Sequence, residues 1–455
     1  MGKVARFLLR FAVCAALAGA LEVPAAETRQ NPPLSGKTLG TIFNNDLNNI
    51  LYALDGSNTT PKQYQAVVQA ILDMQPGVLA QNVGLPDPVI YPTAVGTTFD
   101  KYLVEVSRMT WPENGGADAE RQRDALRSLF AAETDPLTLT IEACRARGLA
   151  IVASFRMNAE DWYDNTYLLS DFGRAHPEYR ISGAGNLDPA VDEVYAHRMA
   201  LLTEAAQRYD VDGLELDFRR WYRMVSNPLE NHTVLTRMVR DTRKMLDETA
   251  RMKKRDKLLL GVRVGPSLDS EPSPYLFPGI FYAEKPTNAS CKELGLDVAA
   301  WFRDGLVDYV CPSLFLATLP GEPLTQEFAK LAEGTQAGVY PTLWPHAAWM
   351  HGIGERRVER GDDKALALYK HDLCQTVLDM YRHGADGIST FNWYAHLRNA
   401  NVPHLWTDGE GAAGAGAEAV QTYAYPLLRD PDSIEEYLRR PWAIPPEPGN
   451  PDAKR

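Results

Sequence analysis

Short apolar and β-branched runs alternate with longer helix-like stretches from residue 38 to about residue 400. Several of the short runs follow a Gly or an Asp-Gly pair, where a helix is expected to end and a strand to begin. Strand followed by helix, repeated along the chain, predicts parallel strands joined by helical crossovers. Eight strands are predicted: Leu39–Asn44, Val78–Val83, Ala150–Phe155, Gly213–Phe218, Leu259–Val264, Tyr309–Pro312, Gly338–Leu343 and Gly387–Asn392.

The stretches between these runs place apolar residues at roughly helical spacing, as Val191, Val194 and Leu202 illustrate. Eight strand–helix units close naturally into a single-domain (β/α)8 TIM barrel of the α/β class, expected here over residues 35–400. An open doubly wound sheet is the alternative, but no Gly-x-Gly-x-x-Gly turn follows the first strand. Helices are predicted over Pro61–Gln75, Pro189–Tyr209, Glu230–Lys253, Asp297–Arg303 and Lys364–His383.

The predicted connections differ in length at the two ends of the strands. Those that precede strands are as short as Arg147-Gly148 and His383-Gly384. Those that follow strands are long, and in a barrel they build the active face at the C-terminal ends of the strands. We therefore expect a deep cleft on that face. The long connections are predicted at residues 84–118, 159–188, 219–229, 265–296 and 344–362.

The two ends of the chain carry different signals. Basic residues up to Arg10 precede the apolar run Phe11–Leu21, and small residues follow it. This pattern is typical of a secretory signal peptide, and the run is too short to span a membrane. We expect residues 1–26 to be removed and the protein to be secreted or periplasmic, without stable membrane insertion. Residues 401–455 are predicted to be an extension with Gly/Ala-rich and Pro-rich segments and one short helix near Ile434–Arg440.

Composition narrows the function classes. The chain of 455 residues is 45% hydrophobic and carries a formal net charge of -12. Because it has no basic block, nucleic acid is not an expected partner. Neither Cys-x-x-Cys, His-x-His nor His-Glu-x-x-His occurs, so we expect no metal and no cofactor. Of five cysteines, four lie beyond the signal segment, and buried free thiols are favoured for Cys311 and Cys374, whereas a disulfide stays open for Cys144 and Cys291.

The strongest chemical signal is the predicted fourth strand. Alternation along a strand places Leu214, Leu216 and Phe218 on one face, and Glu215 and Asp217 on the other. The two carboxylates would point into the barrel, with Cα atoms about 6.5–7 Å apart. Like charges this close do not both ionise easily, so one can act as an acid while the other stays ionised. An ion-paired layer without chemistry is the structural alternative.

Arginines on neighbouring strands support a site at this position. Arg156 ends the third strand, Arg263 lies in the fifth, and Arg219 follows Asp217 closely. If alternation holds, Arg156 and Arg263 flank the carboxylate pair. A guanidinium there would keep a nucleophile ionised or bind a sulfate or uronate group of an anionic sugar. Charge balance for the buried acids is the alternative role.

Amides and aromatic residues gather at the ends of the other predicted strands. Sugars offer hydroxyl groups to amides and carboxylates, and C–H faces to aromatic rings, so this mixture favours a carbohydrate cleft. Any one of these residues is weak support by itself, and Trp344 or Trp393 fits core packing equally well. Asn44 and Asp46 also end the first strand. The candidate binding residues are Asn45, Asn82, Asn158, Trp344, His346, Asn392 and Trp393.

The segment Asp212–Arg220, which contains both carboxylates, resembles the fourth-strand motif of barrel glycosidases. It is most similar to the glycoside-hydrolase-like proteins of the family-10-like group. The resemblance covers about residues 38–400, but only short motifs are specific. Ser154–Asn158, His176–Tyr179, Gly384–Gly387 and Phe391–Trp393 also look similar to that group.

Two better-known families share the strand pattern. In the alpha-amylase type, the corresponding Asp is the nucleophile, which implies that role for Asp217. The Arg that this type carries two residues earlier is replaced by Glu215. In the chitinase type, the catalytic Glu falls where this chain has Arg219, so the resemblance does not imply chitinase chemistry.

These observations predict a secreted glycoside hydrolase that acts on a polysaccharide or oligosaccharide, neutral or anionic, through two carboxylates. Asp217 is expected to be the nucleophile or charge stabiliser, and Glu215 the general acid/base. Asp269 or Glu271, on the connection after the fifth strand, is the second choice for the acid/base. A non-catalytic carbohydrate-binding TIM barrel and a polysaccharide lyase are the alternatives, the latter requiring a base such as Tyr222 or His346.

Overall fold

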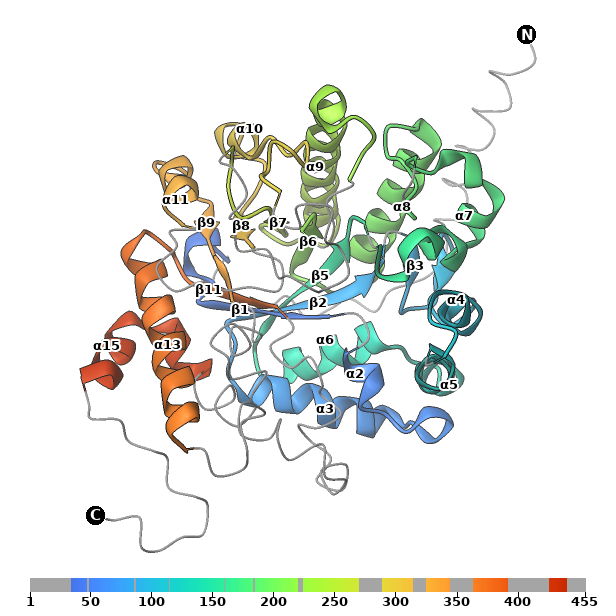
Figure 1. The fold of residues 1–455 in the computed structure, drawn as a ribbon, viewed down its shortest axis with the longest axis horizontal. Coiled ribbons are helices and arrows are strands. Elements are labelled where there is room, and N and C mark those ends of the chain that lie inside the picture. Colours follow the sequence, from blue (N-terminus) through green and yellow to red (C-terminus); the bar gives the residue numbers. More distant parts are fainter. Residues whose placement is uncertain are drawn as a thin grey trace, which may run out of the picture. The chain divides into compact units, whose positions relative to one another are not determined.

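The computed structural model describes the chain from Leu34 onward, with gaps. Strands lie in the middle of this unit and helices surround them (Figure 1). The structure therefore has the α/β class and the alternating element order that the sequence predicts. The described residues are 34–46, 49–85, 87–113, 115–158, 160–182, 185–219, 224–269, 289–313, 325–343, 363–391 and 425–439.

The central strands are parallel and run in the order β10-β11-β1-β2-β5-β6-β7-β8-β9. A small flap of β3 (Pro88–Val89) and β4 (Thr97–Thr98) pairs with the end of β2. The predicted strands are present within two residues at each end. Their bounds are β1 Thr41–Asn45, β2 Val78–Gly84, β5 Ala150–Arg156, β6 Gly213–Asp217, β7 Leu259–Val264, β8 Tyr309–Pro312, β9 Gly338–Val339, β10 Thr342–Leu343 and β11 Ile388–Phe391.

The predicted seventh strand is divided into two short pieces. β9 pairs with β8, and β10 pairs with β11. Between them lie Tyr340 and Pro341, and proline has no N–H to contribute to a ladder. The carbonyl of Pro341 still accepts from Ser389 N (3.0 Å), and Tyr340 N donates to Val310 O (2.8 Å). The same segment thus joins both ends of the sheet and closes the strands into a (β/α)8 barrel.

The five predicted helices are present as α3, α8, α9, α10 and α13, with ends that differ from the prediction by at most three residues. Helix α3 begins where Thr60 and Gln63 form a capping box and Pro61 occupies the first turn. The α-helices are α2 Asn49–Tyr52, α3 Pro61–Asp73, α4 Leu103–Thr110, α5 Gly115–Ala131, α6 Pro136–Ala146, α7 Asp171–Ala175, α8 Asp192–Arg208, α9 Pro228–Met252, α10 Val298–Arg303, α11 Gln326–Ala332, α13 Asp363–Arg382 and α15 Pro431–Arg439. The 3-10 helices are η1 Gly36–Thr38, η2 Gly56–Asn58, η3 Glu160–Leu169, η4 Pro177–Tyr179 and η7 Tyr425–Arg429.

Two of the predicted long connections are more ordered than expected. Residues 84–118 hold β3, β4, α4 and the start of α5, and residues 159–188 hold η3, α7 and η4. Helix α4 buries Leu103 and Val106 on one face. Its eight residues present too short an apolar stripe to stand out from a loop in the sequence.

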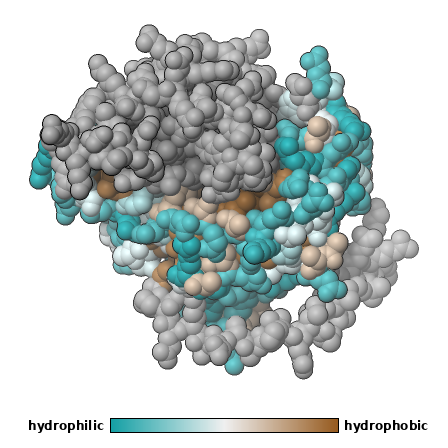
Figure 2. All heavy atoms as spheres, turned by 90° about the horizontal axis from the view of Figure 1, so that it is seen from below, coloured by the Kyte–Doolittle hydropathy of each residue, from teal (hydrophilic) through white to brown (hydrophobic). Residues whose placement is uncertain are grey.

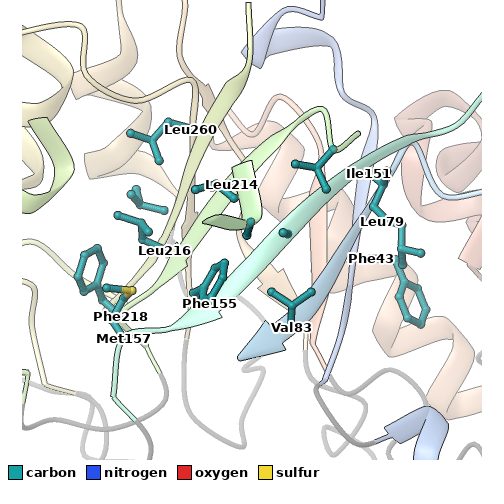
Figure 3. Close-up of a cluster of buried hydrophobic side chains, with 14 of the residues drawn as sticks. Phe43, Leu79, Val83, Ile151, Phe155, Met157, Leu214, Leu216, Phe218 and Leu260 are labelled. Carbon is teal, nitrogen blue, oxygen red and sulfur yellow. The ribbon is translucent and has the colours of Figure 1, made fainter. Parts of the chain in front are cut away.

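The two faces of the strands pack into different layers. Figure 3 shows one layer, in which Leu79, Val83, Ile151 and Phe155 point away from the barrel axis toward the helices. A smaller cluster fills the interior at the N-terminal end of the strands. It contains Leu39, Ile42, Val78, Ala80, Ala150, Val152, Leu259, Tyr309, Cys311 and Tyr340. Beyond this plug, toward the C-terminal ends, the interior side chains become polar and charged.

The segment after residue 424 packs against the barrel. The ring of Tyr425 lies 5.6 Å from that of Phe43, and Tyr381 donates to the carbonyl of Leu428 (2.8 Å). The predicted short helix of this extension is α15. Leu428 and Ile434 are buried, so residues 425–439 contribute to the core of the barrel unit.

The remaining features of the fold are the state of the cysteines and the character of the surface. Cys144, Cys291, Cys311 and Cys374 are all buried free thiols, as the sequence favours for the last two. The face of the molecule in Figure 2 is largely hydrophilic where residues are coloured, with hydrophobic areas between. Within the described ranges, no helix combines the length and the apolar character that crossing a membrane would require.

Candidate functional site

The fourth barrel strand, β6, presents its carboxylates to the barrel interior. Leu214, Leu216 and Phe218 join the layer between strands and helices, where Figure 3 shows them together. Glu215 and Asp217 alternate with them and are both 0% exposed. The alternation predicted from the sequence is thus present, and it places two acids beyond the apolar plug.

Glu215 is held by donors from four other strands. Its Oε1 accepts from the Asn44 amide (2.8 Å) and the Ser154 hydroxyl (2.9 Å). Its Oε2 accepts from the Tyr309 hydroxyl (3.2 Å) and lies 3.5 Å from the Arg263 guanidinium. Both oxygens are therefore satisfied by hydrogen bonds, and the side chain is fixed in one orientation.

A glycine makes room for one of these donors. Gly261 on β7 faces the barrel interior beside the ring of Tyr309 on β8. A Cβ at residue 261 would lie 1.9 Å from Tyr309 Cζ. Because Gly261 has no side chain, the Tyr309 ring lies across it and its hydroxyl reaches Glu215.

Asp217 has a different environment. Its Oδ1 accepts from the backbone N–H of Arg219 (2.9 Å), whereas Oδ2 is buried and has no hydrogen-bond partner among the described residues. Burial raises the pKa of Asp217 to about 6, Arg263 opposes the shift, and the anionic Glu215 adds to it. Asp217 can therefore hold or release a proton near neutral pH, and its Oδ2 is not used by any hydrogen bond among the described residues.

The strand register places an arginine on each side of Asp217. Asp217 pairs with Arg156 on β5 and with Arg263 on β7, as predicted. Arg156 forms a buried ion pair with Asp46, at the end of β1. Arg263 donates to the hydroxyls of Thr342 (2.7 Å) and Ser389 (2.8 Å), in addition to its contact with Glu215.

Arg219 is the third guanidinium of the region. It is buried, and its Nε donates to the carbonyl of Ser313 after β8. Arg156, Arg219 and Arg263 thus all have partners within the protein. Charge balance for Asp46 and Glu215 is the role that these contacts support directly.

The predicted amides fall in different places. Asn82, on β2, pairs in register with Ser154, is 0% exposed, and has neither amide atom hydrogen-bonded within the described chain. Asn158 follows β5 and is buried. Asn45 donates to Gln81 (2.8 Å). Of the three, Asn82 leaves the most hydrogen-bonding capacity that a bound molecule could satisfy.

The remaining predicted site residues lie elsewhere or outside the described ranges. Asp269 is exposed and forms an ion pair with Lys292 (2.8 Å). No contact joins it to Asp217 within the described chain. Five candidates fall outside the described residues: Glu271, Trp344, His346, Asn392 and Trp393.

Sequence reasoning did not assign roles to Asn44, Ser154, Tyr309 and Asp46. Alternation along the first strand offered one signal, because Ile42, Asn44 and Asp46 fall on the same face. That pattern does not predict which strands these side chains contact across the barrel. No cluster of three or more His, Cys, Asp or Glu side chains that could hold a metal is present among the residues with described positions.

Comparison with known proteins yields likenesses in fold. No protein-family model matches the chain, and no curated protein sequence does. The solved structures that resemble it include alpha-L-fucosidase isoenzyme 2 from Paenibacillus thiaminolyticus, at 11% identity and a TM-score of 0.44, covering 88% of this chain and 50% of that chain. A GH18 chitinase from Cycas revoluta in complex with (GlcNAc)3 has 12% identity and a TM-score of 0.40, covering 85% of this chain and 99% of that chain.

Chemically unrelated proteins resemble the chain to a similar degree. Morphinone reductase in complex with tetrahydroNAD has 11% identity and a TM-score of 0.36, covering 77% of this chain and 82% of that chain. The chain spans about half the length of the fucosidase. Likenesses at these identities and scores concern the barrel architecture and carry no conclusion about activity.

Proposed function

We propose that this protein is a secreted glycoside hydrolase of the (β/α)8 barrel type, with Asp217 as a reacting carboxylate. The observation that carries the proposal is the state of Asp217 at the C-terminal end of β6. It is fully buried, with one oxygen unpartnered among the described residues and a pKa raised to about 6. Carboxylates in that position of a barrel are more often functional than structural.

The chemistry that suits Asp217 is proton donation to a leaving oxygen. Glycoside hydrolysis requires an acid to protonate the glycosidic oxygen and a second carboxylate to act on the sugar or on water. A carboxyl group whose pKa is raised to about 6 is protonated often enough near neutral pH to serve as that acid. We propose this role for Asp217 in place of the nucleophile or charge-stabiliser role that the sequence predicts.

Glu215 is better suited to positioning than to proton transfer. Its two oxygens accept from Asn44, Ser154 and Tyr309 and lie beside Arg263. Moving a proton to or from Glu215 would disturb those contacts. Its fixed negative charge instead helps to keep Asp217 protonated, since like charges disfavour a second ionisation.

The substrate class and the location are also part of the proposal. The unpartnered amide of Asn82 and the buried Asn158 offer hydrogen bonds of the kind that sugar hydroxyls accept and donate. The resemblance of Asp212–Arg220 to the family-10-like group supports a polysaccharide or oligosaccharide substrate. The basic and apolar pattern of residues 1–26 supports export.

The test is reducing-sugar release from a panel of neutral, sulfated and uronic polysaccharides. Wild type is compared with Asp217→Asn, and with Asp100→Asn as a control that alters a buried Asp paired with Arg127 (2.8 Å) elsewhere. Turnover by wild type and the control, reduced by about 10² or more in Asp217→Asn, supports the proposal. Equal turnover in all three contradicts the role of Asp217. Binding to a polysaccharide without turnover would favour the non-catalytic barrel.

A further inference from the structure

Asp46 lies on the interior face of the barrel close to Asp217. Along β1 and the residue after it, Ile42 belongs to the interior plug and Asn44 reaches Glu215. Asp46 is the next residue on that face, nearer to the C-terminal end of the barrel. It is 4% exposed and forms an ion pair with Arg156. A carboxylate thus stands at the same end of the interior as the proposed acid.

Arg156 connects the two carboxylates. It is the register partner of Asp217 on the neighbouring strand, and its positive charge acts on Asp217 as well as on Asp46. Between β1 and β5 lies β2, which contributes Asn82. Both amide atoms of Asn82 and Oδ2 of Asp217 are buried without partners among the described residues. Unsatisfied buried groups on the same interior wall indicate a place where a polar ligand binds.

We propose that Asp46 is the second catalytic carboxylate, the base that takes a proton from water while Asp217 protonates the leaving oxygen. This inference rests on the proposed hydrolase function. The bond between C1 and the glycosidic oxygen breaks, its electron pair goes to the oxygen, and that oxygen takes the proton of Asp217. The attacking water forms the new bond to C1 and gives a proton to Asp46. When the products leave, Asp46 releases that proton to solvent and Asp217 takes one up, so that the net change is the addition of one water.

The proposed role of Asp46 as a base for water predicts the stereochemical outcome. β1 and β6 are three neighbours apart in the sheet, with about 4.8 Å between adjacent strands along the barrel wall. The guanidinium of Arg156 lies against Asp46 from the strand next to Asp217. A pair in which one carboxylate acts as a base on water, rather than as a nucleophile, is an inverting pair. We therefore expect inversion at C1.

The other carboxylates of the region fit the role less well. Glu215 has both oxygens occupied by donors from the barrel wall. Asp269 is exposed and paired with Lys292. Asp46 is buried at the wall that carries the unsatisfied groups, and it forms an ion pair with Arg156.

The experiment uses the full-length protein and whichever polysaccharide of the panel wild type degrades. The variants are Asp46→Asn, Asp46→Glu and the matched control Asp212→Asn, which alters a buried Asp–Arg pair at the opposite end of β6. We expect Asp46→Asn to lower kcat/KM by about 10² or more, whereas Asp212→Asn should leave kcat/KM per folded molecule nearly unchanged. Sodium azide should restore turnover by replacing water and give a glycosyl azide with inverted configuration at C1.

Asp46→Glu keeps the charge that pairs with Arg156. This variant therefore tests the role of Asp46 even if Asp46→Asn does not fold. A loss of about 10-fold or more at unchanged thermal stability supports the proposal, because only the position of the carboxylate has changed. Wild-type activity in both Asp46 variants, a product that retains its configuration, or a loss that azide does not relieve would overturn it. Turnover that depends on Asp217 but not on Asp46 defeats this inference alone, whereas absence of wild-type turnover defeats the proposed function as well.

Discussion

The two ends of β6 carry the same kind of side chain in opposite environments. Asp212, just before the strand, accepts from Arg145 (2.8 Å), from Arg255 and from the backbone N–H of Ile151 (2.8 Å). Burial works against its ionisation, but the two arginines and the backbone hydrogen bond hold the pKa of Asp212 below its ordinary value. Asp217, five residues later, has one unpartnered oxygen, and burial raises its pKa to about 6.

The environment of Asp212 is repeated around its end of the barrel. Asp308, before β8, accepts from the backbone N–H of Leu260 (2.8 Å) and pairs with Arg243 (3.0 Å). Asp386, before β11, accepts from the N–H of Val339 (3.0 Å). Each carboxylate ties one strand to the strand beside it. The N-terminal end of the barrel therefore satisfies its acids for stability, whereas the C-terminal end leaves polar groups unsatisfied, which is the division of roles expected of a barrel enzyme.

The largest expected difference between the two ends is in activity. Asp217→Asn should lower kcat/KM by about 10²–10⁴, because an amide cannot protonate the leaving oxygen. Asp212→Asn should leave kcat/KM per folded molecule within about twofold. The measurement is steady-state hydrolysis of the polysaccharide that wild type degrades, with the folded fraction determined by circular dichroism. Similar losses in both variants would mean that the two ends are not functionally distinct.

The next difference is in stability, with the opposite order. Asp212→Asn leaves Arg145 and Arg255 without their buried carboxylate and should lower the free energy of unfolding by about 3–5 kcal/mol. Asp217→Asn removes a buried charge with an unpartnered oxygen and should not destabilise the protein at pH 7. Urea unfolding at pH 7 measures both, and a destabilised Asp217→Asn variant would contradict the contrast.

The third difference concerns the pH dependence of stability. The pKa of Asp217 is raised by folding, so its ionisation opposes the folded state as pH rises from about 4 to above 6, by about 3 kcal/mol in all. The pKa of Asp212 is lowered by folding, so its contribution is present above about pH 4 and is lost as pH falls below that. Relative to wild type, Asp217→Asn should gain stability between pH 4 and 7. Parallel stability–pH curves for wild type and this variant would show that Asp217 titrates normally.

The smallest predicted effect compares the two carboxylates at the C-terminal end of β6, Glu215 and Asp217. Glu215→Gln removes the anion that helps to raise the pKa of Asp217. The alkaline limb of the activity profile should then move to lower pH, and the altered hydrogen bonds should lower the free energy of unfolding by about 1–3 kcal/mol. A pH–rate profile beside that of wild type tests this. Loss of all activity at every pH would instead identify Glu215 as a group that transfers protons.

The sequence predicted what depends on local periodicity. Alternation along β6 placed Glu215 and Asp217 in the interior, and strand order then set Arg156 and Arg263 beside them. It did not predict that Asn44 and Tyr309 would reach Glu215, or that Asp46 would pair with Arg156, because those contacts depend on the curvature and stagger of the closed barrel. The apolar stripe of helix α4 is so short that the sequence predicts a loop there.

The barrel closes at its divided seventh strand, where one side chain contacts the segment before the first strand. Tyr340, between β9 and β10, points into the apolar plug, donates to the carbonyl of Gly36 (2.7 Å) and accepts from the N–H of Leu39 (3.0 Å). The segment that leads into the first strand is thus fastened to the place where the ring of strands closes. The phenol of Tyr340 couples the folding of the first and seventh strands. The backbone amides of residues 338–340, 342–343 and 36–39 should therefore exchange with deuterium together rather than as two independent groups.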